Sequence, residues 1–435
     1  MKILFCDHPQ FDHMTFHLYE GLIRVLGSGA VIDYPYKPTY HGAPSYNLND
    51  IKWYQRFAQE LRDGKRAMPS WLPPFAPGET LTYDNVQQIG SAPYPGATSN
   101  DGHEHDEDEI VDTIDSFDLI VLGNGHRVPT IALARLKERC KQLPPIVYCD
   151  GGEIDEFNSH WVHTFRPALS FKRGLTPEVI KEYSGDYVNV RVPVLPLPLP
   201  LSNPCTYLPT YQAFQEAPVA PRSVDFTSHF GFTCPEREAL QQRAVTVAVR
   251  EGMTTNTARA PMGQAYYKLL SSTRIALTIR GLGRETGRYW EIPVLGAAML
   301  CDGTMGCVHP FPFQDGITAS FYRNLDEMEK KLVELHHNDG LRQTIAAAGQ
   351  VHARKYHSVE ARALYFLALV RQRIGLTFTE VQSAKREAWR VKLGWDSELP
   401  EWRGEVIGYE TDLSLGGYKQ PEDWAPPQNL RNLKG

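Results

Sequence analysis

The 435-residue chain lacks several features that would assign it to a particular class of protein. None of its apolar runs approaches the roughly 18 residues of a membrane-spanning helix, and the run in MKILFCDHPQF is too short for a signal peptide. Basic residues are also in the minority, so the net charge is −6, which argues against a general nucleic-acid binder. We therefore expect a cytoplasmic protein, in which any polyanionic partner binds at a local patch.

The seven cysteines form no Cys-x-x-Cys pair, and their scattered positions indicate reduced, buried thiols rather than disulfides or a structural zinc site. The tightest group of possible metal ligands is HEHDEDE at 103–109, where His103 and His105 could hold an ion. Because this group lies in a run of charges after Asn and Gly, we interpret it as a solvated loop. The sequence thus predicts no metal and no bound cofactor.

Two separate β-α series predict an α/β protein with parallel sheets. The first series has apolar runs at 2–7, 29–36, 117–125 and 144–152, all followed by polar residues or glycine, as parallel strands that feed functional loops are. The second has predicted strands at 223–231, 274–281 and 297–303, and helices at 235–250, 324–338, 340–356 and 357–374. No internal repeat is present.

Three further segments complete the predicted organisation. Residues 37–112 are an insertion rich in Pro, Tyr and Trp with one helix at 48–64, and residues 376–435 resemble a wrapping tail. The proline-alternating stretch 191–209 must be extended and cannot be a central strand; it is either an interdomain connector or a peptide ligand for another protein. We expect an amino-terminal domain at 1–203, a linker at 204–222 and a carboxy-terminal domain at 223–375.

The segment RGLGRETGRYWEIPVLG at 280–296 has the composition of an anion site. A strand, a glycine loop and the start of a helix capped by Thr286 would direct backbone N–H groups and the helix dipole at a diphosphate. Two alternatives remain open. The glycines resemble a dinucleotide fingerprint with Asp302 as its acid, but the third glycine, Gly287, is one place late. Otherwise the glycines only turn the chain and the arginines are solvated.

The segment from Arg288 to Asp302, RYWEIPVLGAAMLCD, resembles the R-x-x-E-x-x-x-x-G segment of CgeB-like (spore-maturation-type) glycosyltransferases, which have the GT-B fold and a glycosyl transferase group 1-like carboxy-terminal domain. The stretches at 223–240 and 313–362 are similar to other motifs of that family, so the resemblance spans about residues 223–375. It implies two Rossmann-like domains with parallel sheets facing a central cleft. It also implies Leloir-type transfer of a hexosyl or pentosyl group from a UDP or GDP sugar to an acceptor hydroxyl.

The resemblance assigns Glu291 to the ribose of the nucleotide, whose vicinal hydroxyls a carboxylate can accept. The other donor-site residues of this segment would surround the diphosphate; they are Arg280, Gly281, Gly283, Arg284, Glu285, Thr286 and Arg288. An i,i+3 salt bridge between Glu291 and Arg288 is the structural alternative. The Glu, seven residues, Glu pattern of many retaining enzymes is absent, because its first position is Gly283, so the stereochemical outcome stays open.

The base that deprotonates the acceptor is expected in loops that follow strands of the first domain. Our candidates are Asp12, His13, Asp150 and Glu153, with Asp7, His8, Asp155, His126 and Arg127 in the same loops. Each of these polar residues could instead cap or turn the chain. The acceptor could be a glycan, a small molecule or a modified DNA base. The alternative function is a non-catalytic protein that binds nucleotide sugars or glycans.

Overall fold

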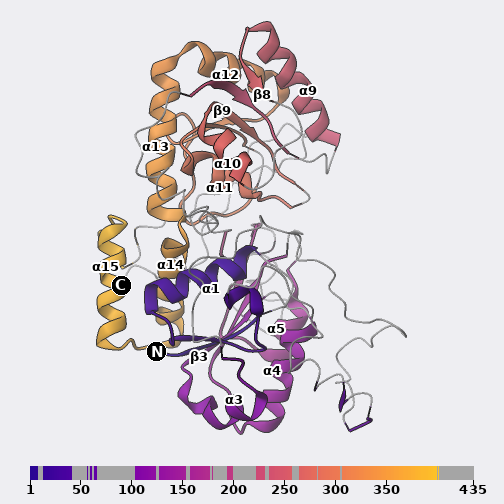
Figure 1. Cartoon of the computed structure of the whole chain (residues 1–435), viewed down its shortest axis with the longest axis vertical. Coiled ribbons are helices and arrows are strands. Elements are labelled where there is room, and N and C mark those ends of the chain that lie inside the picture. The colour runs from indigo at the N-terminus through magenta and orange to yellow at the C-terminus, as the bar shows by residue number, and fades with distance from the viewer. Residues whose placement is uncertain are drawn as a thin grey trace.

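The structure is a computed structural model, and two parallel sheets organise it. It describes residues 1–7, 13–41, 56, 59–60, 63–65, 103–123, 127–152, 157–176, 179, 194–198, 222–230, 235–256, 264–281, 283–303, 306–398 and 400. The first sheet has the strand order β2-β1-β3-β4-β5-β6 and the second has the order β11-β10-β9-β7-β8. The α/β class with two parallel, Rossmann-like sheets is therefore confirmed (Figure 1).

The first sheet is built from short apolar strands that helices cover on both faces. Its strands are β1 (Ile3–Cys6), β2 (Val31–Asp33), β3 (Leu119–Gly123), β4 (Ile146–Asp150), β5 (Leu169–Lys172) and β6 (Val194–Pro196). The side chains of odd-numbered residues in β1 pack with α1 (His13–Leu26) and α14 (Val359–Ile374). Those of even-numbered residues pack with α3 (Glu107–Thr113), α4 (Arg127–Arg139) and α5 (Ser159–Phe165). Burial on both faces explains why these strands are continuous apolar runs.

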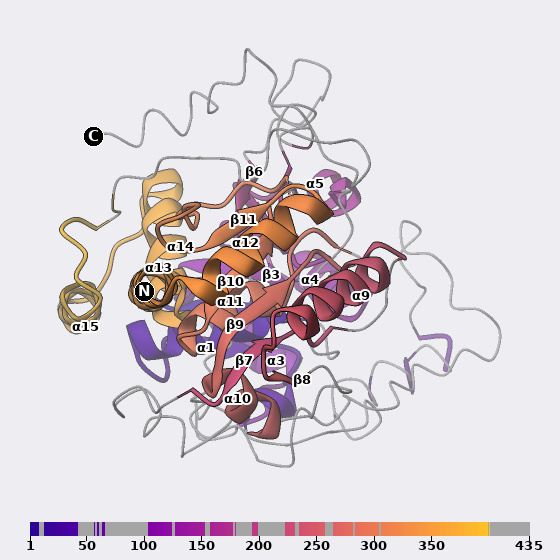
Figure 2. The ribbon, with the colours of Figure 1, turned by 90° about the horizontal axis from the view of Figure 1, so that it is seen from above.

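The second sheet repeats this layering. Its strands are β7 (Val224–Thr227), β8 (Thr255–Asn256), β9 (Thr273–Thr278), β10 (Ala298–Asp302) and β11 (Ser320–Tyr322). As Figure 2 shows, α9 (Pro235–Arg250) and α12 (Leu325–His337) cover one face, while α10 (Gln264–Ser271) and α11 (Gly287–Val294) lie on the other. Helix α13 (Asp339–His357) packs along α11 and β10, and α14 then crosses back to the first sheet.

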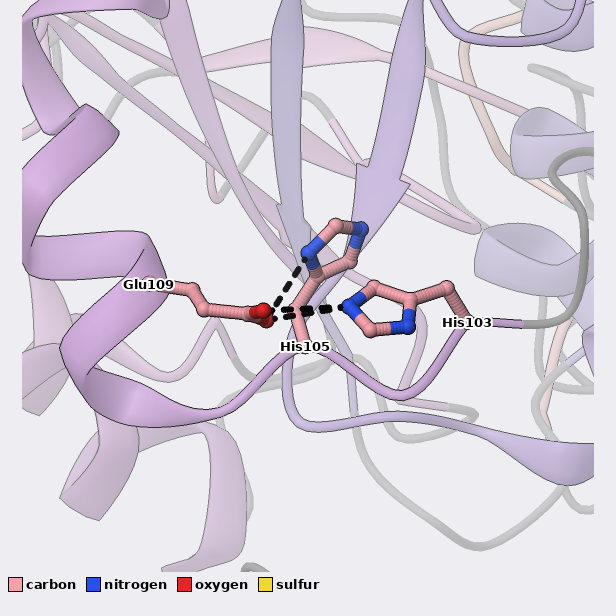
Figure 3. Close-up of side chains that lie close together, drawn as sticks. All are labelled: His103, His105 and Glu109. Atoms are coloured by element: carbon pink, nitrogen blue, oxygen red, sulfur yellow. Dashed lines mark hydrogen bonds and ion pairs between the residues drawn. The ribbon is translucent and has the colours of Figure 1, made fainter.

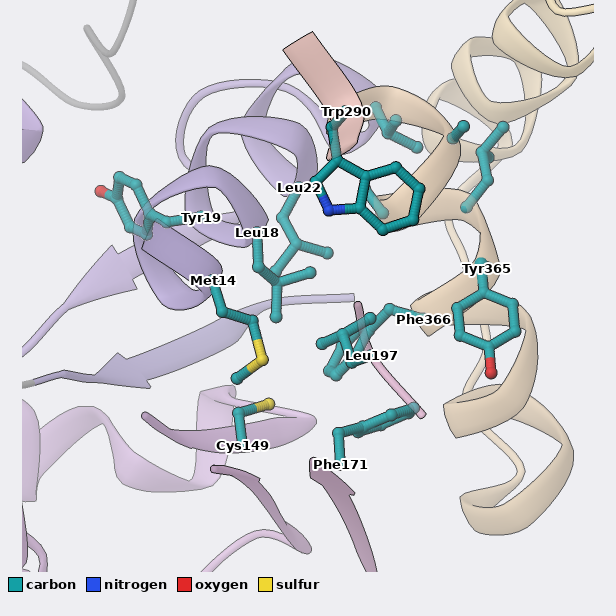
Figure 4. Packing of buried hydrophobic residues seen from close by; sticks show 14 of the residues in the cluster. Met14, Leu18, Tyr19, Leu22, Cys149, Phe171, Leu197, Trp290, Tyr365 and Phe366 are labelled. Carbon is teal, nitrogen blue, oxygen red and sulfur yellow. The ribbon is translucent and has the colours of Figure 1, made fainter. Parts of the chain in front are cut away.

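One apolar core joins the two sheets. Leu18 and Leu22 of α1, Phe366 of α14 and Trp290 of α11 all belong to the same buried cluster, and Trp290 is 1% exposed (Figure 4). Helix α1 approaches α14 so closely that a Cβ atom on Gly21 would lie 2.2 Å from the carbonyl oxygen of Val359. The next helix, α15 (Glu380–Lys392), also contacts α1. The end of the described chain thus returns to pack on its beginning.

Several elements differ from the sequence predictions. Strands β5, β8 and β11 were not predicted, and Val194–Pro196 of the proline stretch forms β6, an edge strand, where proline is tolerated. The expected solvated loop at 103–109 is in part the first turn of α3. The predicted helix at 48–64 falls largely outside the described residues, and so do residues 201–221 and 401–435. Of the helices in the described part, none is long and apolar enough to cross a membrane.

Candidate functional site

The carboxyl ends of the two sheets meet, and this places their loops side by side. The guanidinium Nη2 of Arg173, just after β5, donates a hydrogen bond of 3.1 Å to the carbonyl oxygen of Glu285. The backbone N–H of Val308, which follows β10, donates to the carbonyl of Leu175 at 2.7 Å. Ligands of parallel α/β sheets bind outside the carboxyl ends of the strands, where the strand order reverses. We therefore describe the two reversal points in turn.

In the second sheet the order reverses between β7 and β9, and the arginine segment begins there. Strand β9 ends at Thr278 and α11 starts at Gly287. The loop 279–286 lies between them, and all of its residues except Leu282 are described. Arg280 and Arg284 thus lie in the loop and Arg288 in the first turn of α11, so the three arginines do not share one helix face. Arg284 is buried, with 8% of its surface exposed, whereas Arg280 and Arg288 are partly exposed.

Arg237 of α9 holds the start of this loop. Its Nε donates to the carbonyl of Arg280 at 2.8 Å, and its Nη2 donates to the carbonyl of Ile279 at 3.2 Å. A Cβ atom on Gly281 would lie 3.0 Å from that Nη2, so glycine leaves the space that the guanidinium needs. Within the loop, the N–H of Gly281 donates to the carbonyl of Gly283 at 2.9 Å. The positioning role of Arg237 was not predicted from the sequence.

Helix α11 begins where the sequence predicted, directly after Thr286. Thr286 is the N-cap, with extended backbone angles (φ −120°, ψ 151°), but its side chain makes no capping hydrogen bond. Its hydroxyl lies instead 3.5 Å from that of Thr278. The first N–H groups of α11 therefore receive no acceptor from the cap side chain, and the positive end of the helix dipole faces the loop. An anion at this point would satisfy those donors.

Glu291 lies one turn along α11 and is held by two tyrosines of α10. The hydroxyl of Tyr266 donates to Oε2 at 3.1 Å, and that of Tyr267 donates to Oε1 at 3.5 Å. Burial raises the pKa of Glu291, and the charge of Arg288 and the two hydroxyls oppose this shift. The charge of Arg288 therefore acts on Glu291, as in the predicted alternative of an i,i+3 pair. The hydrogen bonds to the Glu291 carboxylate given above come from α10. The sequence analysis did not predict either tyrosine. The helical periodicity of α10 was the one signal in the sequence that could have pointed to them.

Two further contacts define the surroundings of this helix. His17 of α1, a residue of the first sheet's layer, is close enough to lower the pKa of Glu291, so the carboxylate lies where the two halves of the chain meet. Glu285 points away from the loop: its Oε1 accepts a 2.7 Å hydrogen bond from the indole N–H of Trp290, and the residue is 3% exposed. Its carboxylate therefore has a partner within the core.

In the first sheet the order reverses between β1 and β3, and Asp7 occupies this point. Its Oδ2 accepts from Lys37 Nζ at 2.5 Å, from the Thr15 hydroxyl at 3.0 Å and from the Tyr40 hydroxyl. Among the described residues, no hydrogen bond reaches Oδ1, and a Cβ atom on Gly123 would lie 2.6 Å from it. Burial, and then the charge of Asp7, raise the pKa of Tyr40 well above its usual value. Lys37 and Tyr40 were not predicted.

The other candidates for the acceptor base are placed as follows. Asp150 ends β4, and its two oxygens accept the N–H groups of Gly152 at 2.9 Å and Asn158 at 3.0 Å, which orders the turn after the strand. His13 and Arg127 are the first residues of α1 and α4. Five candidates lie outside the described residues: His8, Asp12, His126, Glu153 and Asp155.

Solved structures of other proteins align with most of this chain, but with low sequence identity and low TM-scores. A glycosyltransferase from Rickettsia africae ESF-5 has 11% identity and a TM-score of 0.47, over 86% of this chain and 99% of its own. Anabaena Alr3699/HepE in complex with UDP has 12% identity and a TM-score of 0.46, over 86% of this chain and 100% of its own. Since these TM-scores are below 0.5, the fold assignment depends on the strand orders given above.

Comparison with family models gives a match in the second half of the chain. No curated protein sequence matches the chain. Residues 240–368 match the model of a family described as glycosyl transferase-like. This segment begins in α9, ends in α14 and contains the loop 279–286 and α11. The part of the chain that carries the arginine segment is therefore glycosyl transferase-like in sequence.

Proposed function

We propose that the protein is a glycosyltransferase that moves a sugar from a nucleotide-diphosphate sugar to an acceptor hydroxyl. The observation that carries this proposal is the position of the loop 279–286: it follows β9 at the strand-order reversal and leads into α11, whose N-cap side chain makes no capping hydrogen bond. The family match over residues 240–368 supports it independently. Within this class, the R-x-x-E segment favours the CgeB-like type.

The diphosphate would bind at the start of α11. Backbone N–H groups, the helix dipole and one or more of the arginines at 280, 284 and 288 would stabilise the charge that develops on the leaving diphosphate as the bond to the sugar breaks. Glu291 would accept hydrogen bonds from the ribose hydroxyls. Each of its oxygens has a second lone pair beyond the one used by Tyr266 or Tyr267.

The acceptor hydroxyl must lose a proton, and the base would come from the facing edge of the first sheet. Asp12, His13, Asp150 and Glu153 stay predicted bases. Asp7 joins them because it lies at the strand-order reversal and, among the described residues, no hydrogen bond reaches its Oδ1. The transferred sugar is a hexose or a pentose, and UDP and GDP are the donor nucleotides to test first.

Calorimetric titration with UDP and GDP tests the donor site. Neutralising an arginine that contacts phosphate should cost about 1.5 to 3 kcal/mol, or roughly a tenfold to hundredfold loss of affinity. We expect this loss in at least one of Arg280→Ala, Arg284→Ala and Arg288→Ala, and a similar loss in Glu291→Gln. The matched control is Arg250→Ala, which removes an exposed arginine paired with Glu329 on the outer surface of α9. Unchanged affinity in all the site variants, with unchanged melting temperatures, would exclude the donor site.

A second assay separates an enzyme from a binding protein. A transferase incubated with its nucleotide sugar and no acceptor slowly releases sugar to water, whereas a non-catalytic binding protein releases none. Glu291→Gln should lower the rate of this release in proportion to its loss of nucleotide affinity. Tight nucleotide binding without any release, over a panel of UDP and GDP sugars, would support the binding protein instead.

A further inference from the structure

A second group of polar side chains lies at the edge of the first sheet, apart from the donor loop. His103, His105 and Glu109 converge where residues 103–106 lead into α3 (Figure 3). The Nε2 atom of His103 lies 3.1 Å from Oε2 of Glu109, and the Nδ1 atom of His105 lies 3.4 Å from the same oxygen. Asp33, the last residue of β2, is near enough for its charge to act on His105.

The spacing of these atoms fits one divalent transition-metal ion. Zinc ligands at 2.0–2.1 Å in a tetrahedron are about 3.3 to 3.4 Å apart, and the two measured nitrogen–oxygen distances bracket this value. The three ligand atoms all lie within 4.8 Å of one another. The imidazole rings meet edge to face, with centroids 4.5 Å apart and an angle of 88°, so their nitrogens approach the carboxylate from different directions.

The carboxylate is held in place by the backbone. Glu109 is the N3 residue of a capping box, and its Oε2 accepts the N–H of Asp106 at 3.1 Å. This hydrogen bond fixes the carboxylate beside the two imidazole rings.

We propose that His103, His105 and Glu109 bind a divalent transition-metal ion, of which zinc is the best match, through two imidazole nitrogens and one carboxylate. This inference reverses the expectation of a solvated loop. It is independent of the proposed transfer reaction, because none of the three residues belongs to the donor segment. Two histidines with one carboxylate select zinc and its neighbours over magnesium and calcium, which prefer oxygen ligands. The ion would fasten residues 103–105 to the first turn of α3.

Zinc titration of the chelator-treated full chain by calorimetry tests the site. We expect one zinc ion per chain at this site, and a loss of zinc affinity of at least tenfold in each of His103→Ala, His105→Ala and Glu109→Gln. Gln at N3 can still close a capping box, so Glu109→Gln should retain the fold of α3 while it removes the ligand charge. The matched control is His337→Ala, which removes an exposed histidine that is paired with a single glutamate, Glu251, at 3.0 Å.

Cobalt gives a second readout, because Co²⁺ in a tetrahedral site absorbs visible light and the same ion in water absorbs weakly. The wild type and His337→Ala should show this absorption after one equivalent of Co²⁺, and the three ligand variants should not. The proposal is overturned if the wild type binds no zinc, if Glu109→Gln binds it as tightly as the wild type, or if His337→Ala causes the same loss as the ligand variants.

Discussion

Replacing Gly21 by alanine tests the closest contact between the first helix and the end of the chain. Gly21 lies in the middle of α1, where alanine would ordinarily stabilise a helix by about 1 kcal/mol. Here the added Cβ would lie 2.2 Å from the carbonyl oxygen of Val359, 2.9 Å from its carbon and 3.1 Å from the Cβ of Ala363. Two of the three neighbours are backbone atoms at the start of α14, so no side chain can rotate away.

The magnitude follows from the distance. An ordinary contact begins at 3.4 Å, so α1 and α14 must separate by about 1 Å to admit the methyl group. Overpacking of this kind typically costs about 1 to 3 kcal/mol, and larger values follow when backbone must move. Because the neighbours here are backbone atoms, we take the upper part of this range, about 2 to 3 kcal/mol. After the gain of about 1 kcal/mol in helix propensity is subtracted, we expect the unfolding free energy of Gly21→Ala to be about 1 to 2 kcal/mol lower than that of the wild type.

The measurement is the midpoint of urea unfolding together with the melting temperature. Gly340→Ala is the control: Gly340 lies in the first turn of α13, and its added Cβ would meet only Asn338 Oδ1, at 3.7 Å. We expect Gly340→Ala to be as stable as the wild type or more so. A Gly21→Ala variant that matched Gly340→Ala in stability would refute the close approach of α1 to α14.

Three further predictions concern buried charge. Burial and Arg362 lower the pKa of His309 to about 3, so its neutral form stabilises the fold above about pH 6.5, and this is lost as pH falls, at about 1.4 kcal/mol per unit. His309→Gln should therefore show a weaker dependence of urea midpoint on pH between 6.5 and 4; an identical slope would contradict the assignment. Lys37→Met should lower the unfolding free energy by about 3 to 5 kcal/mol, because it leaves the Asp7 charge buried, and the double variant with Asp7→Asn should recover part of that loss. Because the pKa of Glu291 is raised in the folded state, its ionisation lowers the stability of the fold as pH rises. Glu291→Gln should therefore melt at or above the wild-type temperature at pH 7.5. A clearly lower melting temperature would contradict the direction of this shift.

The central strands could be predicted because burial on both faces leaves a simple signal. ILFC and LIVLG are continuous apolar runs, and β1 and β3 form there. Strand β5, LSFK, carries a lysine whose ammonium group donates to the carbonyl of Gly152, so its burial depends on a partner 20 residues away. Strands β6, β8 and β11 have two or three residues each, which is too few for a periodic pattern.

In the candidate site, too, the features set by neighbouring residues were predicted, and the contacts between distant residues were not. The glycine loop, Thr286 and the start of α11 were predicted because cap and turn preferences act within a few residues. Arg173 reaches Glu285 across 112 residues, and Lys37 reaches Asp7 across 30. No spacing rule in one sequence reports such pairs, because the sheet order that brings them together is set by the whole core.

The return of α14 to α1 has a consequence for synthesis on the ribosome. Helix α1 ends at residue 26, whereas the helix that covers it ends at residue 374. At about 5 to 20 residues per second, translation needs roughly 20 to 70 s to supply that cover. During this time α14 is not yet available to cover α1, whose Phe16, Leu18 and Leu22 lie in the same buried cluster as residues of α14. We expect nascent chains stopped before residue 359 to be bound by chaperones that recognise apolar segments, and released once α14 has emerged.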